Sequence, residues 1–172
     1  MPANEETYTF IASATGTGAS NALSFTSIPA TYTDLVVRGT MQTSYSTATT
    51  GRWRFNNDSG NNYSIQRMRT NGQSNFTGSL EASVASVYAG DIVPSASGYV
   101  SSMELNVFSY ADVTNLYPTA TQSAGSPRSG DGWVFSCITY LQLTAINRID
   151  FLIDDGNFTS ESKLALYGIL RA

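Results

Sequence analysis

The chain contains no histidine, one cysteine and one lysine among its 172 residues. Without histidine, neither a Ser-His-Asp nor a Cys-His arrangement can be built, and one cysteine leaves too few ligands for an ordinary zinc site. Cys137 cannot form an intramolecular disulfide, and no histidine is present to activate its thiol. We therefore expect Cys137 to be a small buried hydrophobic residue, and we predict neither a bound metal nor another cofactor.

Charge is also scarce. Charged residues make up 13% of the chain, and 9 basic against 13 acidic side chains give a net charge of −4. A typical globular domain has about 25% charged residues. The negative balance argues against nucleic acid as a partner. Low charge suits a protein that stays packed against neighbours, because a free domain usually keeps more surface charge for solubility.

Long apolar runs are missing as well. No segment approaches the roughly 18 apolar residues of a membrane span, and the acidic start Met1–Glu6 lacks the parts of a signal peptide. We expect synthesis in a cytoplasm and no membrane partner. The length predicts one domain, residues 1–172, with residues 1–7 as a candidate N-terminal arm that could order on a neighbour.

Apolar residues alternate with a period of two along most of the chain, and the helical period is absent. We predict an all-β fold, an antiparallel β-sandwich that is jelly-roll-like, with about ten strands. The polar segments 43–50, 71–78 and 119–131 are expected to be loops. The expected strands are 8–14, 23–28, 34–41, 51–57, 62–70, 83–88, 98–110, 132–140, 147–153 and 163–170.

Four arginines occupy alternate positions on two successive expected strands: Arg52, Arg54, Arg67 and Arg69. The turn-rich segment 57–61 predicts a hairpin that places Arg54 opposite Arg67 and Arg52 opposite Arg69. In that hairpin Trp53, Phe55 and Met68 point to the core. Like charges directly opposite each other are destabilising, so such a ladder favours an anionic partner. The arginine face is our candidate protein interface; a solvated face, or contact with a phosphorylated glycan or nucleic acid, is the alternative.

Acidic residues offer weaker signals. The segments 56–62 and 154–157 are typical of turns, although each also resembles a fragment of a calcium loop. Carboxylate-only glycoside hydrolysis needs two acids that flank a groove, and Glu81, Asp91 and Glu104 are the candidates. Nothing in their sequence context indicates such a pair, so we predict a protein without enzymatic activity.

Three strings resemble a known family. They are LSFTSIPATYTDL at 23–35, RFNNDSGNNYS at 54–64 and NFTSESKLALYGI at 157–169. In this order, they are similar to the opening, a central hairpin and the closing strand of small virion structural proteins of tailed phages, often of aquatic bacteria and cyanobacteria. Asn57 and Glu161 depart from that pattern, which usually has glycine there. Both lie in expected turns, so they affect local loop geometry and not the fold.

The resemblance implies a non-enzymatic structural protein of a virion. Family members occur as capsid decoration (cement) proteins and as domains of head or tail fibres. We expect a decoration protein on the capsid surface, which binds the major capsid protein and copies of itself, with a trimer favoured. The alternative is a tail- or head-fibre module that recognises a host glycan. The resemblance carries no catalytic residue to this chain.

Overall fold

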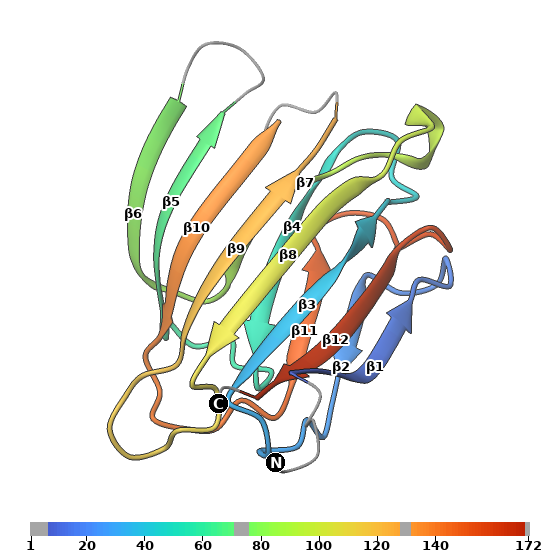
Figure 1. Cartoon of the computed structure of the whole chain (residues 1–172). Coiled ribbons are helices and arrows are strands. Elements are labelled where there is room, and N and C mark those ends of the chain that lie inside the picture. The colour runs from blue at the N-terminus through green and yellow to red at the C-terminus, as the bar shows by residue number, and fades with distance from the viewer. Residues whose placement is uncertain (1–6, 71–75, 128–131, 171–172) are drawn as a thin grey trace.

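The computed structural model describes residues 7–70, 76–127 and 132–170 (Figure 1). In this part of the chain the fold is all-β, and its only helical element is a short 3-10 turn, Ser95–Ser97. The strands are β1 (Tyr8–Thr15), β2 (Ala22–Phe25), β3 (Asp34–Met41), β4 (Thr49–Phe55), β5 (Tyr63–Thr70), β6 (Phe76–Val84), β7 (Val87–Ile92), β8 (Ser101–Phe108), β9 (Thr119–Gly125), β10 (Trp133–Tyr140), β11 (Ile149–Ile153) and β12 (Lys163–Ile169).

The strands form two antiparallel sheets packed face to face. The large sheet has the order β1-β12-β3-β8-β9-β10-β5-β6, and the small sheet has the order β2-β11-β4-β7. The block β1-β12-β3-β8 facing β2-β11-β4-β7 has the strand order of a jelly roll, eight strands in two Greek keys. The predicted antiparallel, jelly-roll-like sandwich is confirmed. The described residues hold two strands more than the expected ten.

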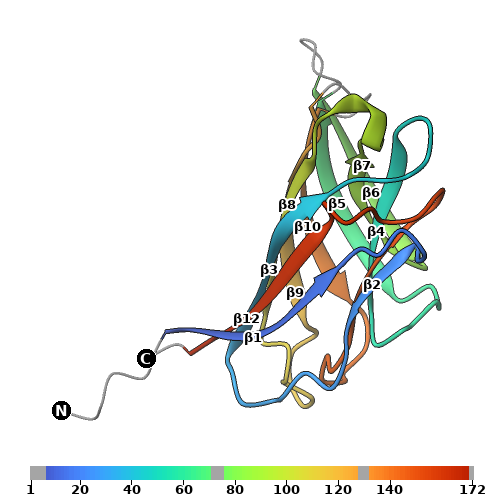
Figure 2. The ribbon, with the colours of Figure 1, turned by 90° about the vertical axis from the view of Figure 1, so that its right-hand side faces the viewer.

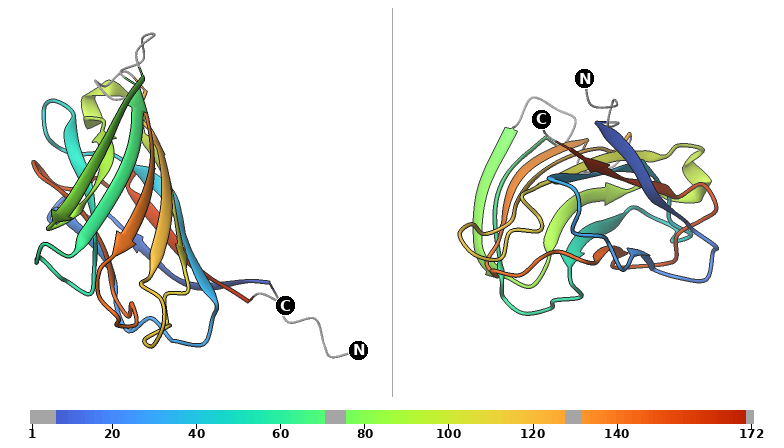
Figure 3. Two further views of the ribbon diagram at one scale, coloured as in Figure 1. Left: turned by 90° about the vertical axis from the view of Figure 1, so that its left-hand side faces the viewer. Right: turned by 60° about the horizontal axis from the view of Figure 1, so that its bottom comes forward.

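Two insertions widen the large sheet. β5 and β6 lie in sequence between β4 and β7, and β9 and β10 lie between β8 and β11. All four add to the same side of β8, so β6 becomes the outer edge of the large sheet. Figure 3 shows this edge from the left-hand side, and its right-hand view shows the sheet curving there. At the opposite edge β1 runs beside β12, with Tyr8 opposite Ile169 (Figure 2).

The core between the sheets follows from the alternation. In β4, Trp53 and Phe55 point inward and are almost fully buried, and the Trp53 ring packs on Phe151 with ring centroids 4.5 Å apart. In β10 every second residue from Val134 to Tyr140 is buried. Burying such large side chains is the main source of stability for a sandwich without disulfides.

Two strands lie in segments that the sequence predicts as loops. β9 occupies part of 119–131, and β6 overlaps 71–78; residues 71–75 and 128–131 lie outside the described residues, as does the candidate arm except Thr7. β9 has small inward residues, Ala120 and Ala124, on either side of Gln122. Small side chains weaken the apolar signal of a strand, but they allow a close approach to the small sheet, since a Cβ built at Gly90 of β7 would lie 3.3 Å from the Cβ of Ala124.

The expected hairpin of β4 and β5 is wrong. β4 pairs with β11 and β7 in the small sheet, whereas β5 pairs with β10 and β6 in the large sheet. The connection therefore crosses from one sheet to the other. The turn residues of segment 57–61 do not distinguish a hairpin from a crossover, since Asn, Asp and Gly provide the tight backbone conformations that both connections need.

Candidate interaction surfaces

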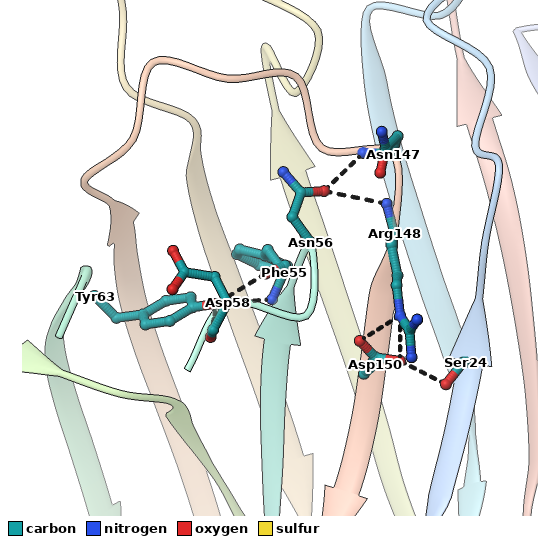
Figure 4. Close-up of polar contacts among 8 residues, drawn as sticks. All are labelled: Ser24, Phe55, Asn56, Asp58, Tyr63, Asn147, Arg148 and Asp150. Carbon is teal, nitrogen blue, oxygen red and sulfur yellow. Dashed lines mark hydrogen bonds and ion pairs between the residues drawn. The ribbon is translucent and has the colours of Figure 1, made fainter. Parts of the chain in front are cut away.

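Hydrogen bonds to the buried hydroxyl of Tyr63 stabilise the crossover between β4 and β5. Asn56 and Asn57 adopt left-handed backbone angles, with φ of 52° and 55°. The hydroxyl of Tyr63 accepts a hydrogen bond from the Phe55 amide (2.9 Å) and lies 3.1 Å from the carbonyl oxygens of both Phe55 and Asp58, to which it can donate (Figure 4). Burial raises the pKa of Tyr63, so the hydroxyl remains a donor.

Asp58 closes the same turn. Its carboxylate accepts hydrogen bonds from the Gly60 amide (2.7 Å), the Asn62 side chain (2.8 Å) and the Tyr140 hydroxyl (2.9 Å). Burial alone would raise the pKa of Asp58, but these bonds and the nearby charge of Arg54 outweigh it and lower the pKa below its usual value. The only carboxylate of the segment is thus engaged within the turn, which favours the turn over a calcium loop.

A second set of contacts joins this turn to the segment before β11. The Asn56 side-chain oxygen accepts from the amides of Asn147 (3.0 Å) and Arg148 (3.3 Å). Arg148 Nε then contacts both carboxylate oxygens of Asp150, at 2.9 Å each, and Ser24 donates to the same carboxylate (Figure 4). Asp150 is only 2% exposed although it lies on the outer face of the small sheet.

The four arginines do not share a face. Arg52 and Arg54 project from the outer face of the small sheet, opposite the inward Trp53. Arg67 and Arg69 lie on the face of β5 that carries Tyr63 and points toward the small sheet, since they share its alternation. Met68, expected in the core, is 43% exposed on the opposite side. The predicted ladder is wrong because its two strands belong to different sheets.

Arg52 and Arg67 nevertheless meet at one groove. This groove of about 430 Å³ lies between β4 and β7 of the small sheet and β5 and β6 of the large sheet. Arg52 forms a bidentate ion pair with Asp154 at 2.7 and 2.8 Å. Arg67 contacts Glu81 at 2.5 Å and lies over the Tyr88 ring, 4.5 Å from its centroid. Both guanidinium groups are neutralised within the chain, so the groove does not require an anionic partner.

The outer face of the large sheet carries a feature that the sequence analysis missed. Five large apolar side chains are exposed on the neighbouring strands β6, β5 and β10, and we call them the apolar patch: Phe76 (66% exposed), Leu80 (66%), Met68 (43%), Trp133 (37%) and Phe135 (37%). The strand register brings them together, because Phe135 lies opposite Met68, and Phe76 and Trp133 flank Thr70. The Trp133 and Phe135 rings are almost parallel, with centroids 6.2 Å apart.

Cys137 lies on the same outer face and is exposed, so the prediction of a buried thiol is wrong. Its neighbours Ser136 and Ile138 point into the core instead. The alternation of Trp133–Tyr140 allows either face to be the inner one, since both contain apolar residues. Only the position of β10 beside β5 and β9 decides which set is covered.

The three candidate catalytic acids are each held by a neighbour. Glu81 pairs with Arg67, Glu104 pairs with Arg38 at 2.7 Å, and Asp91 accepts from Tyr88 at 3.2 Å. Within residues 7–70, 76–127 and 132–170, no group of three or more acidic, cysteine or histidine side chains is placed to hold a metal ion. The described helical residues include no span long and apolar enough to cross a membrane.

Comparison with protein-family models, with curated protein sequences and with solved structures gives no match for this chain.

Proposed function

We propose that this protein is a non-enzymatic structural protein of a virion, most specifically a capsid decoration protein that stabilises the head shell. The observation that carries the proposal of a contact function is the apolar patch. Exposed apolar area concentrated on one sheet face is typical of surfaces that another molecule covers. The assignment to a virion rests on the three strings that resemble tailed-phage virion proteins.

The architecture is compatible with this role. Jelly rolls occur in viral capsid domains and in lectins, although a fold alone does not assign a function. A decoration protein binds at symmetric positions of a shell, so each copy needs only a modest interface and many copies add up by avidity. The partners would be the major capsid protein and other copies of this chain.

The proposal predicts a high copy number. In a stained gel of purified virions, a decoration protein is present at one copy per major capsid subunit or a simple fraction of that, whereas a fibre contributes a few copies per particle. A ratio below about one tenth would exclude decoration, because the symmetric positions of a shell would remain mostly empty.

The patch can be tested directly on capsids that lack the protein. Phe135→Asp places a charge among apolar neighbours, so we expect capsid binding to weaken at least about tenfold, since large buried aromatic side chains dominate interfaces. Ser13→Asp, an exposed change on β1, is the matched control and should bind normally. Unchanged binding of Phe135→Asp, with the fold intact by circular dichroism, would contradict the assignment of the patch.

The arginines remain a separate prediction for the same assay. Among the residues that the structure describes, Arg54 forms no ion pair, and it lies on the outer face of the small sheet, whereas Arg67 is 14% exposed and packs on Tyr88. Charge reversal at Arg54 breaks no ion pair, whereas reversal at Arg67 breaks its pair with Glu81. Because the Arg54 charge also acts on Asp58, circular dichroism must first show that Arg54→Glu is folded. If Arg54→Glu binds capsids normally, Arg54 is not part of the interface.

A second candidate function is host-glycan recognition by a fibre module. It is favoured by the nearly parallel, exposed rings of Trp133 and Phe135, a platform on which sugar rings can stack. Glycan-array binding that is lost in Trp133→Ala, together with a low copy number per virion, would support this candidate over decoration.

A further inference from the structure

The edge strand β6 is open along part of its length. β6 spans Phe76–Val84, and in the described part of the chain it pairs with β5 alone. Its residues from Phe76 to Leu80 are all exposed. An unpaired edge presents a row of backbone N–H and C=O groups that can pair with another strand.

The usual protections of an edge are missing from the first half of this strand. Residues 76–80 (FTGSL) contain no charge and no proline. In the second half Glu81 is bound to Arg67, and the pairing register with β5 shifts between Tyr63 and Ile65, next to a left-handed Ser83. A bulge of this kind disfavours further pairing. The regular, open segment is therefore Phe76–Leu80.

We propose that a second copy of this chain pairs here, through antiparallel β6–β6 contact about a two-fold axis at Gly78. In this register Phe76 of one copy faces Leu80 of the other on the outer face, and each Gly78 faces its counterpart. The two large sheets become one continuous sheet. The apolar patches of both copies then meet across the axis, because Met68 lies beside Gly78 and Phe135 beside Met68.

The sequence of this edge favours a second copy of the chain as its partner. Residues 76–80 carry no charge with which to recognise a partner of opposite charge, and their sequence is self-complementary about Gly78 in shape and polarity. In this pairing Phe76 of one copy contacts Leu80 of the other, whereas the rest of the patch lies one or two strands further from the axis, on β5 and β10, and stays exposed. The contact is therefore much smaller than the ~800 Å² that each partner contributes to a standard interface. Edge pairing adds backbone hydrogen bonds, so association should be reversible and concentration-dependent.

This inference deepens the proposed function, because it names the surface through which copies associate, as a two-fold dimer in place of the trimer favoured above. Its failure is distinguishable from failure of that function. Self-association is measured on the purified chain alone, whereas decoration is measured as binding to capsids. If the chain is a monomer but binds capsids, only the proposed β6–β6 pairing is contradicted. If it dimerises but does not bind capsids, only the decoration function is contradicted.

The first test is sedimentation equilibrium of the wild-type chain and three variants. A Cβ at Gly78 meets only the Arg67 carbonyl oxygen, at 4.0 Å, so substitutions there should fold normally. Gly78→Lys places two like charges face to face and should weaken self-association at least about tenfold. Gly78→Thr adds an uncharged side chain and should retain it. Ser13→Lys charges the opposite edge, β1, and should also retain it.

The second test uses the native cysteine and needs no substitution. Cys137 is exposed on the outer face, in the row that also holds Gln66 and Leu80. From ordinary strand spacing and rise, the two Cys137 Cα atoms of the proposed dimer lie about 25–30 Å apart. A nitroxide spin label on Cys137 should give an interspin distance in this range by double electron–electron resonance.

The outcomes separate cleanly. Concentration-dependent dimerisation that Gly78→Lys abolishes, with the expected spin-label distance, supports the pairing. A wild-type chain that is monomeric at every concentration overturns it. Association that survives Gly78→Lys, or that Ser13→Lys abolishes instead, also overturns it and directs attention to another surface.

Discussion

Gln122 shows how a single polar residue can be required inside an apolar core. It is 1% exposed and accepts a hydrogen bond from Trp53 Nε1 at 2.9 Å, across the space between the two sheets. Its own amide nitrogen contacts the Tyr88 carbonyl oxygen and the Ser136 hydroxyl, at 3.2 Å each. The buried indole N–H is therefore satisfied, which avoids the cost of an orphaned donor.

We expect Gln122→Met to lower the free energy of unfolding by about 1–3 kcal/mol, because the side chain keeps its size but leaves the Trp53 N–H without an acceptor. Urea unfolding followed by tryptophan fluorescence measures this. Ser123→Ala, on the outer face of the same strand, is the control and should change stability by less than about 0.5 kcal/mol. Equal stability of both variants would contradict the bridging role of Gln122.

Asp58 makes the free energy of unfolding decrease at acidic pH. Its pKa in the folded protein lies below the usual 3.8, so the folded state binds this proton less readily than the unfolded chain does. The resulting stabilisation is present above pH 3.8 and is lost as the pH falls through the lower, folded pKa. Asp58→Asn should therefore be destabilising near neutral pH.

Urea midpoints of the wild type and of Asp58→Asn, measured at about pH 7 and about pH 3, test this linkage. The two midpoints should differ at neutral pH, and the difference should shrink below pH 3.8, since protonation of the carboxyl, first in the unfolded chain, removes the stabilisation. A difference that is the same at both pH values would show that the Asp58 charge does not contribute.

At the scale of elements, β12 depends on one close approach. Gly168 lies on the inner side of β12 against the ring of Tyr32, and a Cβ at this position would overlap that ring. Glycine is needed here for space, not for an unusual backbone angle. The strand is central in the jelly roll, between β1 and β3, so it cannot shift without disturbing both neighbours.

Gly168→Ala should therefore destabilise the fold by about 1–3 kcal/mol through overpacking. Gly78→Ala is the matched control, because a Cβ there has room and the change should be nearly neutral. Thermal unfolding of the two variants measures the difference. Combining Gly168→Ala with Tyr32→Ala should lose less than the sum of the single effects, and simple additivity would contradict a direct clash.

Most strands could be predicted from the sequence, and β9 shows why one could not. β9 (TATQSAG) consists of Thr, Ala, Gln, Ser and Gly and lacks large apolar side chains, so only its position between β8 and β10 makes it a strand. The prediction that the four arginines share one face was wrong for another reason. Alternation correctly placed Arg52 and Arg54 on one face, yet it contains no information on which sheet β5 joins.

At the scale of the whole molecule, pairings join distant parts of the chain. β1 pairs with β12, β2 pairs with β11, and the expected local hairpin of β4 and β5 is replaced by a crossover. Loops between distant segments must close before such contacts form, which slows folding. We expect refolding roughly in the range of milliseconds to seconds. Stopped-flow fluorescence of Trp53 and Trp133 measures this rate, and refolding within microseconds would contradict the topological argument.

The sequence by itself determined that this chain is an antiparallel sandwich, because strands with one apolar face, in a chain without helical periodicity, can bury that face only against another sheet. The absence of histidine also restricted the chemistry available. Only the tertiary structure decided which strands are neighbours, and with them the separation of the arginines, the exposure of Cys137 and the apolar patch beside β6. Local residue patterns specify the faces of each strand, whereas strand partners are selected by long-range packing between sheets.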